Sequence, residues 1–492
     1  MDARAILWDD TAIYLRRYEK AATALIAVQQ VLRSRRPLRG EEDEFLDLCG
    51  SAVSADPEHF TQLWRDPSAY FWVRRAYELL GSCLNPASRT PELEKYCSAI
   101  GSAKPQEALA LHLEEFKKLI IGLNMISGGE RRFRRPMETK LPFSIPGSRY
   151  SVTGCGSVRA TGIDRRMLEV VYNGESIRLE IGNRPAGADA PRIAECPMAW
   201  RGAYELLLKP EAFYLPGIGA ADVLHDVPDC FQGQQVALLE KALELIERHQ
   251  PFAYEHLCEV VRVIALKPPA SGRYSNVSYS DLPGAFILSA FQEPYWIADA
   301  LIHELFHNRL FFIQEVEPIL IEPDGAETAN FYSPWRDDLR PLNGLLHALY
   351  VYIQVVRFWS CVWRSGETGG QRKAYVADQA VRGTLGVAIA ASQLRRHGRF
   401  TKVGAELFAE LESEAETAVS AMSALGLSSA VPAMIARPDG EIVLSGTGPH
   451  GRPLTVIDTL RQHARRHDVH RQCSDLEAIL RTEGGLPEAT LD

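Results

Sequence analysis

The run LIHELFHNRL, from Leu301 to Leu310, constrains this chain more than any other stretch of the sequence. In an α-helix, residues four positions apart lie on one face, so His303 and His307 can direct their imidazoles at one metal ion. The neighbouring residues are apolar, and the longer segment EPYWIADALIHELFHNRLFFIQ has Glu293 and Pro294 near its start. We therefore expect a buried helix that carries two ligands of a metal centre.

The residue between the two histidines adds a second chemical group to this site. Glu304 follows the first histidine directly, so it can approach a metal-bound water without ligating the metal. In metallopeptidases, a carboxylate at this position is the general base. The apolar run around Ala285 to Ser289, just before the helix, predicts a strand.

Length and composition limit the class of protein. A chain of 492 residues with 46% hydrophobic and 24% charged residues predicts a soluble protein of two to four structural units. The net charge of -9 argues against a general nucleic-acid binder. An acidic N-terminus, nine scattered cysteines without a CxxC pair, and no apolar window of about 18 residues favour a cytoplasmic protein with reduced thiols and no membrane partner.

Four regions follow from changes in periodicity along the chain. Residues 1–135 predict a helical N-terminal region, and ERRFRRP (130–136) reads as a linker or a solvated face. Residues 136–215 predict a β-rich middle region, in which YNGES is a hairpin turn. Residues 216–367 contain the metal motif, and residues 368–492 predict helices with a small hairpin at ARPDGEIVLSG. The expected fold class is α+β, mainly α with a β-rich middle.

A metal centre needs a third protein ligand, and the sequence offers alternatives. His347 lies in PLNGLLHALYVYIQVVRFW, whose periodicity predicts a helix that can run antiparallel to the first and place His347 opposite His303 and His307. Glu327 lies twenty positions after His307, a separation familiar from glutamate-type zinc peptidases, but nearby prolines and a glycine leave little room for a helix there. Glu322 and Asp324 are further alternatives, and His347 is the favoured ligand.

Three more histidines, His463, His467 and His470, lie in the basic segment TLRQHARRHDVHRQ near the C-terminus. No glutamate or apolar support accompanies them. We expect them on a solvated helix face and assign them no metal.

The blocks SYSDLPGAFILS, ADALIHELFHNRL, YSPWRDDLRPL and GLLHALYVY together resemble the HExxH-type peptide-modifying proteins of ribosomal-peptide natural-product clusters. Members of that family are regarded as Fe(II)- and 2-oxoglutarate-dependent peptide β-hydroxylases. The resemblance is most specific from about residue 279 to 359. It implies a zincin-like HExxH helix core flanked by helical N- and C-terminal regions.

The resemblance also implies a dioxygenase with Fe(II) as cofactor and 2-oxoglutarate as co-substrate, in natural-product biosynthesis. A guanidinium suits the distal carboxylate of 2-oxoglutarate because it can form two parallel hydrogen bonds with it. Arg336 and Arg340 are the candidates for this task, unless they pair with nearby aspartates to fix a turn. Tyr332, Ser333 and Trp335 are expected to line the same pocket.

The expected partner is a precursor peptide, held through its leader segment or along the strand at Ala285 to Ser289. Under the oxygenase reading, Glu304 orients a metal-bound oxygen, a ligand or the substrate. Zinc can bind in place of iron, since imidazole serves both ions. The alternatives are a zinc metallopeptidase that uses Glu304 as general base and a non-catalytic, metal-stabilised peptide-binding protein.

Overall fold

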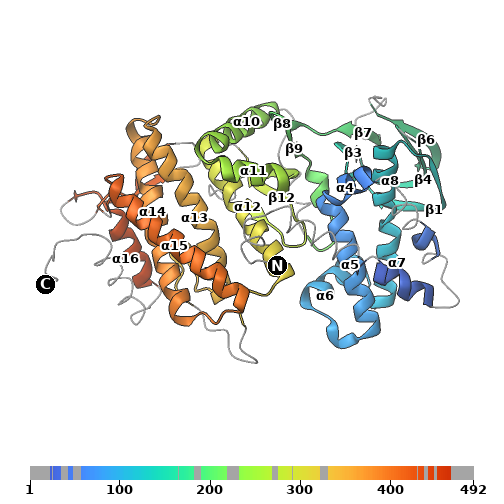
Figure 1. The fold of residues 1–492 in the computed structure, drawn as a ribbon. Coiled ribbons are helices and arrows are strands. Elements are labelled where there is room, and N and C mark those ends of the chain that lie inside the picture. The colour runs from blue at the N-terminus through green and yellow to red at the C-terminus, as the bar shows by residue number, and fades with distance from the viewer. Residues whose placement is uncertain are drawn as a thin grey trace.

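The protein has a mixed α+β fold with two hydrophobic cores, one toward each end of the chain (Figure 1). This computed structural model describes residues 23–24, 26–34, 43–47, 57–102, 104–164, 166–181, 190–218, 232–268, 275–290, 292–321, 331–428, 430–436, 441–447 and 451–466. The N-terminal helices and most strands gather at one end, and the long C-terminal helices gather at the other. The α+β class predicted from the sequence is confirmed.

The N-terminal end is a group of helices, and α4 to α7 each begin with a proline. Asp66 caps one helix by accepting a hydrogen bond from Ser68 N, and Thr90 caps the next by accepting from Leu93 N. Gly128 adopts a left-handed conformation (φ 70°) and ends the last of them. The helices are α4 (Pro57–Trp64), α5 (Pro67–Leu84), α6 (Pro91–Ala99), α7 (Pro105–Glu115) and α8 (Lys117–Ser127).

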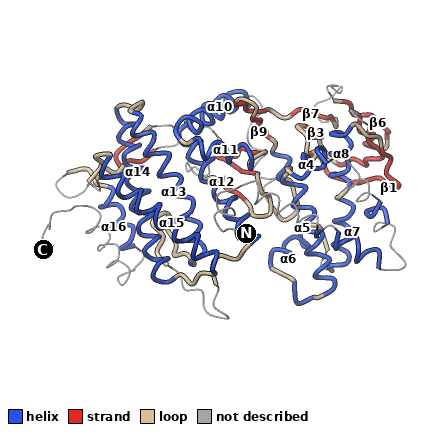
Figure 2. Tube along the Cα trace, in the orientation of Figure 1, coloured by secondary structure: helices blue, strands red, loops and turns tan. Residues whose placement is uncertain are grey.

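Two antiparallel sheets follow, seen as the cluster of strands in Figure 2. The first has the order β1-β4-β5-β6, and the second has the order β2-β3-β7. The YNGES hairpin is confirmed: Asn173 (φ 51°) and Gly174 (φ 86°) form the turn between β5 and β6. The strands are β1 (Arg131–Lys140), β2 (Phe143–Ser144), β3 (Tyr150–Thr153), β4 (Ser157–Asp164), β5 (Met167–Tyr172), β6 (Glu175–Glu180) and β7 (Arg192–Glu195).

The basic run ERRFRRP is not a linker. It enters β1, which pairs with β4, and the boundary expected after residue 135 therefore falls inside this strand. Phe133 is buried, whereas Arg134 points outward and pairs with Asp43 and Asp47. The exposed side chain of Arg134 agrees with the expected solvated face. The segment forms a strand because it pairs with β4, which comes later in the sequence.

A five-stranded mixed sheet occupies the middle of the molecule, in the order β11-β12-β10-β9-β8. Strand β10 runs parallel to both β9 and β12, while the edge strands β8 and β11 run antiparallel to their neighbours. The bounds are β8 (Met198–Arg201), β9 (Tyr204–Leu208), β10 (Val263–Lys267), β11 (Val277–Ser278) and β12 (Ala285–Ser289).

The strand predicted at Ala285–Ser289 is confirmed, but its expected role in peptide pairing is not. Strand β12 is paired on both sides, with β10 and β11, and all five of its residues are buried. Its main-chain hydrogen bonds are therefore used within the sheet. The edge that faces away from β12 belongs to β11.

Long helices cover this sheet and form the C-terminal end (Figure 1). The helix with the two histidines, α12, packs on α10, α11 and α13. The bounds are α10 (Gln232–His249), α11 (Pro251–Val260), α12 (Pro294–Val316), α13 (Leu342–Ser365), α14 (Gly370–His397), α15 (Lys402–Ala424) and α16 (Val456–Arg466). Strands β13 (Met434–Ala436) and β14 (Ile442–Leu444) pair antiparallel, which confirms the C-terminal hairpin.

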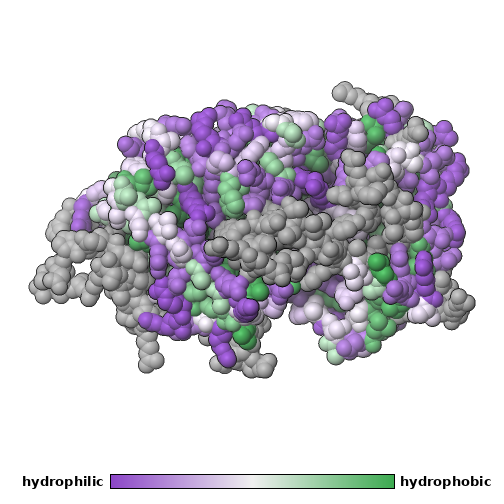
Figure 3. Space-filling model, viewed as in Figure 1, coloured by the Kyte–Doolittle hydropathy of each residue, from purple (hydrophilic) through white to green (hydrophobic). Residues whose placement is uncertain are grey.

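Helix α13 is long and apolar enough, by length and composition, to span a membrane. In the protein, however, 72% of its most apolar window is buried, as in the core helix of a folded domain. The coloured part of the surface in Figure 3 is largely hydrophilic, with hydrophobic residues in smaller groups between the hydrophilic ones.

Candidate metal centre

The predicted histidine helix and its partner are confirmed as α12 and α13, which run antiparallel. His347, near the start of α13, contacts His307 and Gln314 late in α12, whereas Trp359, late in α13, bonds Asp299 early in α12. The antiparallel arrangement predicted from the sequence therefore brings His303, His307 and His347 together.

The three imidazoles form a row and not a ring. His307 Nε2 lies 3.1 Å from His303 Nε2, and His307 Nδ1 lies 3.3 Å from His347 Nδ1. His347 Nε2 lies 2.9 Å from Gln314 Oε1. Because the two nitrogens of one imidazole point in different directions, His303 and His347 approach different edges of the His307 ring.

Burial keeps all three imidazoles neutral near pH 7. It lowers the pKa of His303 to about 3, with smaller contributions from His307 and Arg336. Burial lowers the pKa of His307 to about 4 and, with His307 adding to the effect, that of His347 to about 3. Neutral imidazoles keep the lone pairs that a metal ion requires.

The donor set fits a metal ion through two of these residues. Two Nε2 atoms 3.1 Å apart, each about 2.1 Å from a shared ion, would subtend about 95° at it, close to the angle between neighbouring octahedral ligands. Within the described ranges, no group of three or more His, Cys, Asp or Glu side chains is placed to hold an ion. His303 and His307 fit as ligands through Nε2, whereas His347 approaches the other ring nitrogen of His307.

The other predicted third ligands, Glu322, Asp324 and Glu327, lie outside the described residues. The same is true of His467 and His470.

Glu304 lies on the side of α12 that faces the sheet. Its carboxylate accepts hydrogen bonds from Ser278 of β11, and Lys267 of β10 is the nearby cation. Burial raises the pKa of Glu304 to about 7, while Ser278 and Lys267 oppose that shift. This carboxyl can therefore exchange a proton near neutral pH, next to the edge strand of the sheet.

The predicted co-substrate block lies beside His303 through an aromatic stack. Trp335 stacks on Tyr352 (ring centroids 4.2 Å apart, interplanar angle 5°), and Tyr352 meets His303 edge-on at 5.2 Å. Trp335 also packs on α14 at Gly386, where a Cβ atom would lie 2.6 Å from the indole ring. The block is thus fixed from both α13 and α14.

The two arginines of the block differ in their relation to the histidines. Both approach Asp338, at 3.5 Å from Arg336 and 3.1 Å from Arg340. The Arg340 contact has the distance of an ion pair without the alignment of a hydrogen bond. Only Arg336 is close enough for its charge to lower the pKa of His303. The turn-fixing pairing considered for the sequence is therefore present, and Arg336 is the arginine that approaches the metal ligands.

Tyr332 and Ser333 are both buried. The Tyr332 hydroxyl lies 2.9 Å from His463 Nδ1, on α16, and the Tyr332 carbonyl accepts a hydrogen bond from Gln393 Nε2. The expectation that His463 is solvated is wrong: its side chain is 14% exposed and also lies 3.5 Å from Asp337. The periodicity of α16 gave no signal for this contact because the partner is 131 residues away.

Asp299 is a further titratable residue of this region that the sequence reasoning missed. It lies one helical turn before His303, and its carboxylate accepts a 2.5 Å hydrogen bond from Trp359 Nε1. Burial raises the pKa of Asp299 to about 6, and the bond from Trp359 opposes the shift. The signal was available, because Asp299, His303 and His307 recur at intervals of four residues on one helix face.

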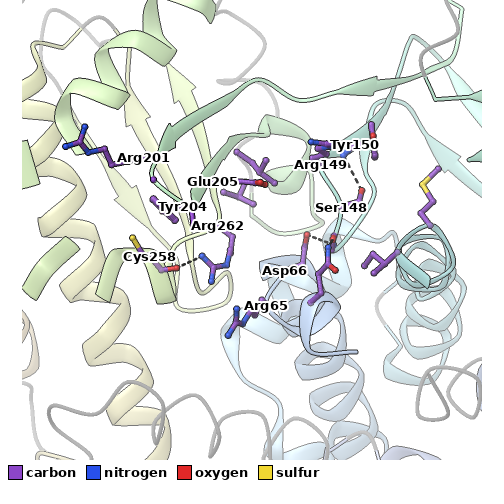
Figure 4. A pocket seen from close by; sticks show the side chains of 18 of the residues that line it. Arg65, Asp66, Ser148, Arg149, Tyr150, Arg201, Tyr204, Glu205, Cys258 and Arg262 are labelled. Carbon is purple, nitrogen blue, oxygen red and sulfur yellow. Dashed lines mark hydrogen bonds between the residues drawn. The ribbon is translucent and has the colours of Figure 1, made fainter. Parts of the chain in front are cut away.

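A cavity of about 1340 Å³ lies apart from the histidines, where the N-terminal half meets the central sheet (Figure 4). Asp66 and Ser148 approach it from one side, and Arg201, Tyr204 and Arg262 approach it from the other. Arg262 caps the end of α11 by donating to backbone carbonyls. None of the three histidines of the row lines this cavity, so it is a separate feature of the fold.

No protein-family model matches this chain. A search of curated proteins also finds no matching relative.

Proposed function

We propose that this protein is a non-haem Fe(II)- and 2-oxoglutarate-dependent oxygenase that hydroxylates a β-carbon in a ribosomally made precursor peptide. One observation carries the proposal: two neutral imidazoles, His303 and His307, present Nε2 atoms 3.1 Å apart, and the Arg336 guanidinium is near enough to lower the pKa of His303. A metal-binding pair beside a cation is the combination that a chelating keto acid with a distal carboxylate requires.

A zincin-like core is the finer fold assignment that accompanies this proposal. Its support is the packing of α12 against a mixed sheet whose edge strand, β11, runs antiparallel to its neighbour. Glu304 of α12 bonds Ser278 of β11, which ties the histidine helix to that edge. The resemblance of the residue 279–359 region to the HExxH-type peptide-modifying family points to the same core.

Each residue then has a defined task. His303 and His307 hold the metal through their Nε2 atoms, and the bound Fe(II) supplies the dioxygen chemistry. Arg336 holds the distal carboxylate of 2-oxoglutarate, replacing its contact with Asp338 by a stronger paired one. Trp335 and Tyr352 keep this side of the site apolar and fix the ring of His303. Glu304 positions the substrate or a proton at the sheet edge.

The proposed substrate is an extended peptide, because the edge strand β11 lies next to Glu304 and strand edges bind extended chains through main-chain hydrogen bonds. A leader segment of the same precursor is a further proposed contact. The composition of the chain supports a cytoplasmic site of action.

A zinc metallopeptidase is the second candidate, and a different observation favours it. A general base works best when its pKa lies near the working pH, and burial raises the pKa of Glu304 to about 7. Both candidates share His303 and His307, so metal binding alone does not separate them. Dependence on 2-oxoglutarate does.

The deciding experiment uses the metal-free full-length chain. Fe(II) is added without oxygen, 2-oxoglutarate is titrated in, and the visible absorption is recorded. A saturating charge-transfer band is expected, and His303→Ala and His307→Ala should abolish it.

Arg336→Gln and Arg340→Gln are matched variants, since each removes one guanidinium that approaches Asp338. Loss of a partially exposed carboxylate contact of about 1–2 kcal/mol should weaken 2-oxoglutarate binding about 5- to 30-fold in the Arg336 variant. The Arg340 variant should bind as the natural chain does. Absence of the band, with tight zinc binding and peptide cleavage that Glu304→Gln abolishes, would replace the oxygenase by the peptidase.

A further inference from the structure

The hydrogen bonds that join His307, His347 and Gln314 have a defined donor-to-acceptor direction, which the side-chain amide of Gln314 sets. Gln314 Nε2 donates to Asn343 Oδ1 at 2.6 Å, which turns Gln314 Oε1 toward His347 Nε2 at 2.9 Å. An amide oxygen only accepts hydrogen bonds, so His347 must carry its proton on Nε2. In a neutral imidazole with its proton on Nε2, Nδ1 is a bare acceptor.

The same donor and acceptor rules assign the proton of His307. His347 Nδ1 is an acceptor, so His307 must donate from Nδ1 across the 3.3 Å contact. A neutral imidazole with its proton on Nδ1 has its lone pair on Nε2, which in His307 is the atom that lies 3.1 Å from His303 Nε2. The row thus leaves His307 in the tautomer that can ligate a metal through Nε2.

We propose that His347 is a positioning residue and not the third metal ligand: it accepts the Nδ1 proton of His307 and, with Gln314 and Asn343, fixes the tautomer and ring orientation of His307. This inference rests on the proposed metal centre and assigns His347 a role other than the one that its sequence context predicted. It follows a general rule, since a ligating histidine commonly donates its other ring N–H to an orienting acceptor.

Geometry separates the two roles. A third ligand must present a nitrogen to the ion that the other two nitrogens share, whereas His347 Nδ1 approaches His307 Nδ1, on a different edge of that ring from Nε2. His347 Nε2, the second nitrogen, is committed to Gln314. Both nitrogens of His347 therefore have partners other than the Nε2 atoms of His303 and His307.

The amide of Gln314 acts as a selector of the tautomer. If that amide were reversed, its N–H would donate to His347 Nε2, His347 would donate from Nδ1, and His307 would carry its proton on Nε2. A proton on that atom blocks ligation. Asn343 Oδ1 opposes the reversal because it accepts from Gln314 Nε2.

The first test uses Zn(II) as the probe, because it is diamagnetic, and long-range ¹H–¹⁵N spectra of the full chain labelled with ¹⁵N-histidine. Single substitutions assign the signals. Zinc should move the Nε2 signals of His303 and His307 to the range of ligated nitrogens, while His347 keeps a protonated Nε2 and a bare Nδ1. A ligated nitrogen on His347 would overturn the inference and leave the metal centre intact. No ligation of His303 and His307 would remove the metal centre as well.

The second test compares conservative and disruptive variants by zinc competition against a chelator. His347→Gln retains an oxygen that can accept from His307 Nδ1, and His347→Leu does not. Removal of such an orienting partner lowers metal affinity about 10- to 100-fold. The leucine variant should therefore lose that much zinc affinity, whereas the glutamine variant should retain most of the affinity of the natural chain.

Gln314 provides a check at a partly exposed position, where the fold tolerates change. Gln314→Glu keeps the acceptor for His347 and should bind zinc as the natural chain does, whereas Gln314→Leu should bind more weakly. Equal losses in both members of the His347 pair and no effect in the Gln314 pair would refute the positioning role.

Discussion

Asn308 attaches the histidine helix to the central sheet, and its replacement by alanine tests how the site is held in place. The side chain is fully buried, its Oδ1 accepts from Gly284 N at 2.9 Å, and its Nδ2 donates to Glu304 O at 3.2 Å. Asn308→Ala leaves the Gly284 N–H without an acceptor, at a cost of about 1–3 kcal/mol, and opens a small cavity worth about 1 kcal/mol more. We expect the free energy of local unfolding around Gly284 and Asn308 to fall by about 2–4 kcal/mol.

Hydrogen exchange measures that loss locally, without assuming that a chain with two cores unfolds in one step. In a peptide covering residues 282–289, the Gly284 amide should exchange about 30- to 1000-fold faster in the variant. The matched control is Asn85→Ala, which removes an exposed cap whose Oδ1 accepts from Ala87 N at 3.2 Å and should cost about 1 kcal/mol or less. If Asn308→Ala costs no more than Asn85→Ala and exchange in 282–289 is unchanged, Asn308 does not hold the helix to the sheet.

Three further predictions concern the rest of the fold. Burial lowers the pKa of His112 to about 4, below its ordinary value of about 6.5, so the unfolded chain binds the proton more readily than the folded chain. Its contribution to stability is therefore complete above pH 6.5 and is lost as the pH falls toward 4, by up to about 3 kcal/mol; urea melts of His112→Gln should show a flatter dependence over that range. Gly284 has φ +78°, and a Cβ there would lie 2.4 Å from a backbone oxygen, whereas Gly174 (φ +86°) has open space. Calorimetry should show that Gly284→Ala costs about 1–3 kcal/mol more than Gly174→Ala, and equal costs would exclude the close contact as the cause. Tyr332→Phe removes the hydroxyl that lies 2.9 Å from His463, so exchange in α16 should rise with a loss of about 1 kcal/mol, while zinc binding stays unchanged.

The predictions that succeeded from sequence alone rest on short-range order. The helix around His303 and His307, the strand at Ala285–Ser289 and the Asn173–Gly174 turn each depend on periodicity or on a local backbone preference. The antiparallel approach of His347 was also predicted, because both helices carry many apolar residues, which they bury in the same core. These features depend on residues that are close together in the sequence.

The relations across the fold could not be read in that way. The residues around the basic run ERRFRRP do not indicate that Arg131–Lys140 pairs with β4. The residues around His463 likewise do not indicate its contact with the Tyr332 hydroxyl. The apolar run Ala285–Ser289 predicts a buried strand, yet only the sheet order decides that β11 takes the edge.

The sequence by itself determined the chemical groups of the candidate site and the helices that carry them. The tertiary structure decided which nitrogen of each imidazole faces which neighbour, that Arg336 and not Arg340 lies close to His303, and that Gln314 ends the row. The physical reason is that periodicity specifies the face of a helix, whereas ring orientation depends on contacts between side chains from different elements.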